Sequence, residues 1–160
     1  MIERPYPYDL ECVWLAQDRD GHLGAFVTGG RGPIPIQFLD SRRIPVQDIE
    51  ELILDLPCIS TAHLLVPYKR PDDYVAIAER GIFTYDWSDV HRTKLESGHA
   101  YELIAMPNRP IQVDALPGAL VAISDIVVDA AFANEKLLNI RKYVSCREGE
   151  WPDPGNRHRR

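Results

Sequence analysis

The sequence predicts a single α+β domain with a mainly antiparallel sheet and two or three helices. Its 160 residues are enough for one domain that buries roughly two thirds of its unfolded surface. Short apolar segments end in turn signals, which favours antiparallel pairing of neighbouring strands, and two segments repeat apolar residues at helical spacing. We assign residues 1–150 to this domain and residues 151–160 to a flexible basic tail.

The first two predicted strands form a hairpin. Residues 10–16 carry apolar side chains on both sides, which is typical of a strand buried on both faces. Asp20 and Gly21 predict the turn, because glycine accepts the positive φ that such turns need, and residues 22–28 predict the return strand. In the loop 29–35 that follows, we expect positive φ at Gly29, Gly30 or Gly32.

Two helices are predicted from their boundaries and spacing. Residues 45–56 begin at a proline, which suits the first turn, and repeat apolar residues until Pro57 stops them. Residues 71–81 also begin at a proline, place Asp72 and Asp73 in the first turn, and end at Gly81.

The remaining elements are predicted as strands, apart from one turn and one open segment. Strands are expected over 59–66, 82–85 and 101–106. Residues 86–89 are interpreted as a turn. Residues 125–146 stay open, because their apolar residues fit a helical stripe and, in part, the alternation of a strand.

The charge of the chain disfavours nucleic acid as a partner. Its formal net charge is −6, and without the three arginines of the tail 15 basic residues face 24 acidic ones. Nucleic-acid binding depends on neutralising phosphates, so such a surface favours a basic protein partner, or else plain solubility.

The compartment is expected to be the cytoplasm. No apolar run approaches the roughly 20 residues of a membrane span, and the N-terminus lacks the pattern of a signal peptide, so no membrane partner is predicted. Three widely spaced cysteines, an odd number, argue against a disulfide framework, and we expect all three to be reduced and mostly buried.

No cofactor or metal is predicted. The loop 29–35 has no Lys-Ser/Thr after its glycines, and Pro35 stands where a dinucleotide fingerprint needs its third glycine. A calcium loop through Asp18 and Asp20 would need ligands at Ala16 and Val27, which cannot supply them. The five histidines show no metal-ligand spacing.

A small hydrolase is the alternative from the enzyme class. Nucleophilic catalysis needs a base beside the nucleophile, and the sequence offers Cys58 with His63. A second set consists of loop residues: Ser88 or Ser97 with His91 or His99. None of these residues lies in a recognised catalytic motif, so no catalytic residue is predicted.

The predicted helix over 45–56 gives the best indication of function. Its solvent side contains no lysine or arginine and carries Gln47, Asp48, Glu50, Glu51 and Asp55. Glu51 and Asp55 repel each other at a spacing of four, and Asp55 faces the negative end of the helix dipole, so stability alone favours a lysine there. An aromatic residue among carboxylates is also typical of a binding hot spot. We therefore predict partner-binding residues on the helix and in the following turn: Asp48, Glu51, Asp55, Asp86, Trp87 and Asp89.

Two stretches of the chain resemble a known family. The runs 14–35 (WLAQDRDGHLGAFVTGGRGPIP) and 81–90 (GIFTYDWSDV), followed by 101–107 (YELIAMP), are similar to small bacterial immunity proteins of polymorphic toxin systems. The resemblance covers roughly residues 9–117 and consists of residues that shape the fold. It implies a cytoplasmic protein that binds and blocks a cognate toxin domain, and it supplies no catalytic residue. A general protein-interaction module without a toxin is a further alternative.

Overall fold

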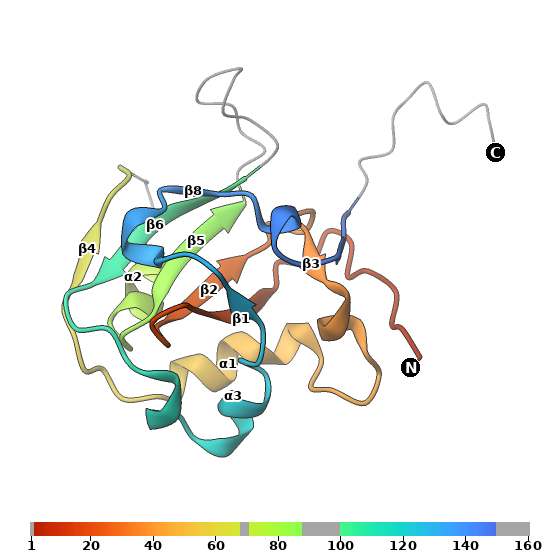
Figure 1. The fold of residues 1–160 in the computed structure, drawn as a ribbon, viewed down its shortest axis with the longest axis horizontal. Helices are drawn as coiled ribbons and strands as arrows, with labels where there is room; N and C mark the ends of the chain where they lie inside the picture. Colours follow the sequence, from red (N-terminus) through yellow and green to blue (C-terminus); the bar gives the residue numbers. More distant parts are fainter. Residues whose placement is uncertain (1, 68–70, 88–99, 150–160) are drawn as a thin grey trace.

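The computed structural model describes residues 2–67, 71–87 and 100–149. Within these residues it contains a seven-stranded mixed sheet, a two-stranded sheet and three α-helices, so the predicted α+β fold with a mostly antiparallel sheet is confirmed (Figure 1). The α-helices are α1 (Ile49–Leu54), α2 (Asp72–Ala78) and α3 (Gly118–Ala122). Short 3-10 helices lie at Ile36–Leu39, Val46–Asp48, Val113–Ala115, Phe132–Asn134 and Ile140–Lys142.

The large sheet has the strand order β4-β6-β5-β2-β1-β7, with β8 also pairing with β6. Its strands are β1 (Val13–Asp18), β2 (Leu23–Val27), β4 (Ala62–Leu64), β5 (Phe83–Trp87), β6 (Tyr101–Pro107), β7 (Val127–Val128) and β8 (Leu137–Leu138). The pairs β2–β5 and β1–β7 are parallel and the others antiparallel. The small sheet joins β3 (Ile34–Pro35) to β9 (Cys146–Arg147).

One face of the large sheet carries stacked aromatic rings. Trp14 lies opposite Phe26, and their ring centroids are 4.2 Å apart; Phe26 in turn stacks on Tyr85 at 5.0 Å. The ring of Phe132 packs edge-on against Phe26 and Tyr85. It also lies over Gly24, where an added Cβ would come within 2.9 Å of the ring. The C-terminal segment therefore closes this face.

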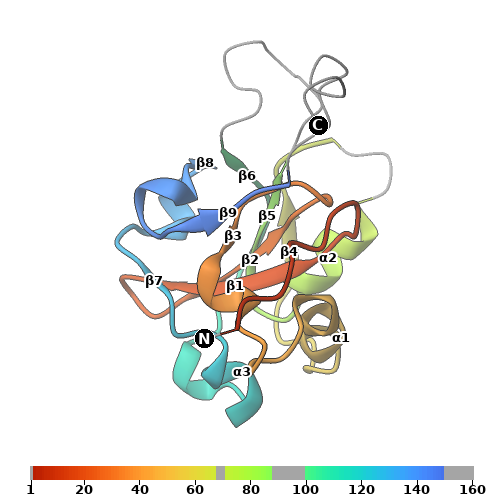
Figure 2. The ribbon, with the colours of Figure 1, turned by 90° about the vertical axis from the view of Figure 1, so that its right-hand side faces the viewer.

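Helices α1 and α2 cover the opposite face of the sheet (Figure 2). Helix α2 packs on β4, β5 and β6, while α1 packs on β1 and also contacts α2. Because both faces are covered, the central strands are buried on both sides, as predicted for the first strand: Val13, Trp14 and Leu15 are all at most 1% exposed.

The hairpin between β1 and β2 forms as predicted. Gly21 has φ +77°, so the turn uses the backbone conformation that glycine adopts most readily. Gly29 and Gly30 also have positive φ, at +60° and +80°. Gly32 is needed for another reason, because a Cβ there would lie 2.6 Å from the Tyr101 hydroxyl.

The predicted boundaries need four corrections. The first strand begins at Val13, and the region predicted as one helix begins with a 3-10 turn before α1. Only Ala62–Leu64 of the run 59–66 pairs as a strand. The turn predicted over 86–89 is wrong for its first half, because β5 continues to Trp87, and both Asp86 and Trp87 pair with β6. The second half lies outside the described residues.

The open segment 125–146 adopts neither alternative as a whole. It alternates the two-residue strands β7 and β8 with single turns of 3-10 helix. The assignment of residues 151–160 to a tail lies outside the described part of the chain. None of the helices in the described ranges has the length and apolar character that crossing a bilayer requires.

Candidate functional site

The acidic side of α1 is exposed, as the helical spacing predicts. Asp48 ends the 3-10 turn before α1, Glu51 lies in its first turn, and Asp55 caps its C-terminus. All three side chains are exposed, while Ile49 and Ile53 on the other side are fully buried. The apolar side holds the helix against the sheet, and the carboxylates therefore face solvent.

Three further carboxylates lie in α1 or next to it. They are Glu11, just before β1; Glu50, in α1; and Asp73, in the first turn of α2. Partial burial, and then the charge of Asp73, raises the pKa of Glu11 above its ordinary value. Burial followed by the charges of Asp73 and Glu11 raises the pKa of Glu50 in the same way. Burial is the larger cause of both pKa shifts, and the like charges of the neighbouring carboxylates add to it.

We call these six residues, Asp48, Glu51, Asp55, Glu11, Glu50 and Asp73, the acidic surface. Within the described residues, none of the six forms an ion pair with a lysine or arginine. Carboxylates elsewhere do pair with arginine, for example Asp125 with Arg43 at 2.7 Å. The acidic surface is thus a region where negative charge has no compensating lysine or arginine among the described residues.

Sequence reasoning placed Glu50 on the acidic side of the helix but missed its neighbours. Glu11 precedes a strand and Asp73 begins a second helix, so only the packing of α1 on β1 and α2 brings the three together. A helical or strand period cannot reveal a contact between separate elements. Asp72 and Asp73 were interpreted as first-turn residues of a helix, and they do lie there.

The other predicted binding residues are not exposed. Trp87 is 8% exposed; its ring packs edge-on against Tyr101, and the Arg141 guanidinium lies over it at 5.3 Å. Asp86 is also 8% exposed and accepts a hydrogen bond of 3.0 Å from the Tyr74 hydroxyl. Neither side chain is available as a surface hot spot. Asp89 lies outside the described residues.

The turn after β1 brings three potential metal ligands together. Ligand atoms of Asp18, Asp20 and His22 lie within 4.8 Å of one another. The Asp18 carboxylate is only 2% exposed, however, and both of its oxygens already accept backbone N–H groups. These hydrogen bonds fix the conformation of the turn and thereby account for the short distances among the three side chains.

The three thiols differ in their surroundings. Burial raises the pKa of Cys12 to about 11 and that of Cys146 to about 12, which disfavours the reactive thiolate. Cys58 is exposed, but no hydrogen bond joins it to His63, and both residues belong to the described part of the chain. The loop serines and histidines of the hydrolase alternative lie outside it.

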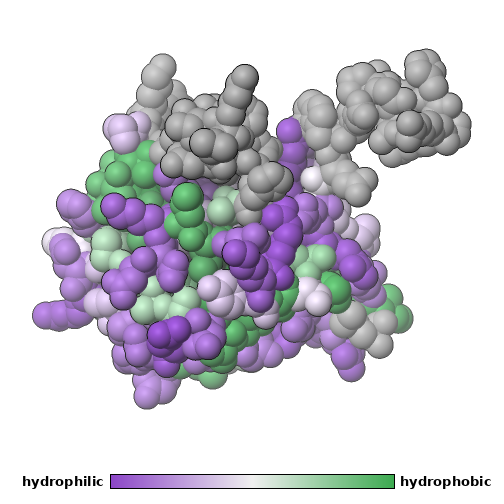
Figure 3. All heavy atoms as spheres, turned by 45° about the horizontal axis from the view of Figure 1, so that its top comes forward, coloured by the Kyte–Doolittle hydropathy of each residue, from purple (hydrophilic) through white to green (hydrophobic). Residues whose placement is uncertain are grey.

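The surface is largely hydrophilic on the face shown in Figure 3, with apolar groups in separate patches. Comparison of the chain with family models, curated proteins and solved structures finds no match. The geometry described above is therefore the basis on which a function is proposed.

Proposed function

We propose that this protein binds a basic partner protein through the acidic surface and, as the resemblance to immunity proteins implies, that the partner is a toxin domain which it blocks. The observation that carries the proposal is the lack of any cationic partner for the six carboxylates among the described residues. Proteins usually intersperse charges of both signs on a solvated face. A cluster of charges of one sign instead fits recognition of the lysine and arginine side chains of a partner.

The proposed mechanism is occlusion. Asp48, Glu51 and Asp55 project from a helix that the sheet holds rigidly, so they can meet a basic surface with little ordering cost. Pairing with cations would also relieve the mutual repulsion of Glu11 and Glu50. Toxins that act on nucleic acid need a basic groove, and an acidic surface seated in such a groove would exclude the substrate.

The experiment reverses the charge of the exposed side of α1. In the triple variant Asp48→Lys, Glu51→Lys and Asp55→Lys, the fold should persist, because all three side chains are exposed. We expect the toxin domain to be encoded beside this protein, and association with it should slow by at least tenfold at low salt. The defect should shrink as the salt concentration rises, because counterions screen the exposed charges. Stopped-flow association rates at two salt concentrations measure both effects.

A matched control moves the same change of charge to another surface. Asp20, Asp114 and Asp129 are exposed and lie outside the acidic surface, so their triple replacement by lysine should slow association much less. Equal effects of the two triple variants would show that only net charge matters and would contradict a defined interface on α1. Trp87→Ala is unsuitable as a test, because the ring is buried and its removal would disturb the core.

A further inference from the structure

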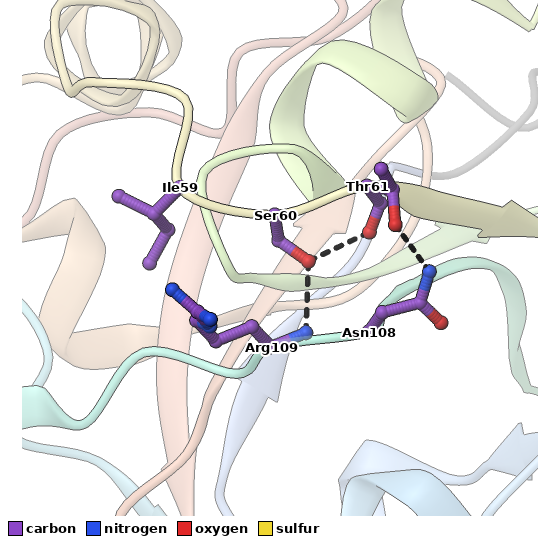
Figure 4. Close-up of a pocket in the computed structure, with 5 residues that line it drawn as sticks. All are labelled: Ile59, Ser60, Thr61, Asn108 and Arg109. Atoms are coloured by element: carbon purple, nitrogen blue, oxygen red, sulfur yellow. Dashed lines mark hydrogen bonds between the residues drawn. The ribbon is translucent and has the colours of Figure 1, made fainter.

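An open pocket lies where β4 begins and β6 ends. It has a volume of about 490 Å³ and is lined by Ile59, Ser60, Thr61, Asn108 and Arg109 (Figure 4). Residues 59–61 lead into β4, and Asn108 and Arg109 follow the last residue of β6. The antiparallel pairing of Ala62 with Pro107 sets these two segments side by side.

Hydrogen bonds between the segments fix the frame of the pocket. The Ser60 hydroxyl donates to the Thr61 carbonyl oxygen at 2.7 Å and accepts the backbone N–H of Arg109 at 2.8 Å. The backbone N–H of Asn108 donates to the same Thr61 carbonyl at 3.0 Å. The Asn108 amide also donates to the Thr61 hydroxyl oxygen, as Figure 4 shows. The backbone of both segments and the side chains of Ser60, Thr61 and Asn108 are therefore positioned before any ligand arrives.

Arg109 differs from the other arginines that the structure describes. Each of the others donates to a carboxylate or a carbonyl oxygen, as Arg43 does to Asp125 and Arg80 does to Leu54. The Arg109 guanidinium forms no hydrogen bond or ion pair with any described residue. Its five N–H donors are free to meet a ligand in a fork geometry.

The unused groups of the pocket are mostly donors. One N–H of the Asn108 amide and the proton of the Thr61 hydroxyl have no acceptor among the described residues, and they add to the guanidinium. The side chain of Ile59 supplies one apolar wall beside the Arg109 stem (Figure 4). A group that carries several acceptor oxygens and a negative charge matches this set.

We propose that this pocket binds an oxyanion, a carboxylate or phosphate group, through a bidentate contact with Arg109 supported by Thr61 and Asn108. The apolar wall at Ile59 suits a short carbon chain attached to that group. The proposal uses none of the residues of the acidic surface and does not depend on the proposed partner. Its ligand is negative, whereas the acidic surface selects a positive one.

The experiment is a titration of the full ¹⁵N-labelled protein with sodium acetate and, separately, with sodium phosphate, followed by NMR. Sodium chloride at matched ionic strength is the reference. Saturable shifts of the Arg109 side-chain Nε–H and of the Thr61 and Asn108 amides, with either anion and not with chloride, are expected. Saturation with acetate alone identifies a carboxylate site, and saturation with phosphate alone identifies a phosphate site; both support the proposal.

Two variants separate the pocket from general charge effects. Arg109→Gln should weaken the apparent affinity for the anion about tenfold or more, since charge-assisted hydrogen bonds are lost. Arg19→Gln removes an exposed arginine that pairs with Asp129 far along the chain, and it should leave the affinity unchanged. The proposal is overturned if the shifts are linear and equal to those with chloride, or if both variants bind as the natural protein does.

Discussion

At the scale of single residues, the Asp18 carboxylate joins two segments that are far apart in sequence. Its Oδ1 accepts the backbone N–H groups of Asp20 and His22, both at 2.9 Å, inside the β1–β2 turn. Its Oδ2 accepts the N–H of Phe132 at 3.0 Å. The ring of Phe132 closes the aromatic face of the sheet. The Asp18 carboxylate therefore fixes both the β1–β2 turn and the segment that covers this face.

Replacing Asp18 by alanine should therefore cost about 3 kcal/mol or more of unfolding free energy. The substitution leaves the buried N–H of Phe132 and the partly buried N–H groups of Asp20 and His22 without their acceptor. A buried unsatisfied group costs about 1 to 3 kcal/mol, and a partly buried one costs less. Urea unfolding of Asp18→Ala beside Asp20→Ala measures the difference. Asp20 is exposed, so its replacement should change stability by about 0.5 kcal/mol at most. Equal losses in the two variants would contradict the role assigned to Asp18.

The sequence predicted the turn at this site but could not predict the third hydrogen bond. Asp20 and Gly21 form a recognisable turn signal because the chemistry is local. The bond from Phe132 depends on a tertiary contact across 114 positions, to which no local pattern corresponds. The sequence could not predict the burial of Trp87 for the same reason, since its ring packs against Tyr101 and lies under Arg141.

At the scale of elements, α1 combines a buried apolar side with charge that opposes stability. Glu50 lies where α1 approaches Glu11 and the start of α2, and its raised pKa reflects both burial and like charge. A carboxyl group whose pKa is higher in the folded state than in the unfolded state favours folding when it is protonated. The contribution of Glu50 to the free energy of unfolding is fully present below its ordinary pKa of 4.5. This contribution is lost as the pH rises through the raised pKa of the folded state.

Glu50→Gln should consequently stabilise the protein at pH 7, by roughly 0.5 kcal/mol after allowance for solvent screening of a half-exposed group. The gain should vanish at pH 3.5, where the natural carboxyl group is already protonated. Urea unfolding at the two pH values tests this, with Glu51→Gln as the exposed control on the same helix. A loss of stability at pH 7 would instead show that the Glu50 carboxylate has a favourable partner.

Elements with local signals were predicted well, and those that depend on distant pairing were not. Pro71 directly precedes α2, as predicted, whereas Pro45 precedes the 3-10 turn before α1. Gly81, with φ +89°, lies in the turn after α2, which already ends at Ala78. The end of β5 was missed because Asp86 and Trp87 look like turn residues, while their pairing with β6 overrides that preference. The apolar residues of segment 125–146 fit two periods in part, and the structure follows neither, because two-residue strands alternate there with single turns of 3-10 helix.

At the scale of the whole molecule, the three cysteines differ in burial, although the sequence predicts that all three are mostly buried. We expected all three to be reduced and mostly buried, and the structure has three free thiols, of which Cys58 is exposed. Cys12 lies in the core, and Cys146 is partly covered in the small sheet. The raised pKa values of Cys12 and Cys146 keep these two thiols protonated at neutral pH.

One thiol per chain should therefore react rapidly with a disulfide reagent in the native protein, and three should react in denaturant. Cys58→Ser should abolish the rapid phase and leave the two slow ones. Release of the chromophore from a thiol reagent at pH 7.5 measures the number of groups and their rates. A rapid phase that persists in Cys58→Ser would show that the core opens readily at Cys12 or Cys146.

The ends of the large sheet have a consequence for behaviour at high concentration. Among the described residues, the sheet ends on one side at β7, which has two residues, and on the other at β4 and β8, which have three and two. Exposed edges are the places where strands from separate molecules join, and very short edge strands offer few free backbone groups for that purpose. The architecture thus protects the long, apolar inner strands from intermolecular association, and the folded protein should stay dispersed when it is concentrated.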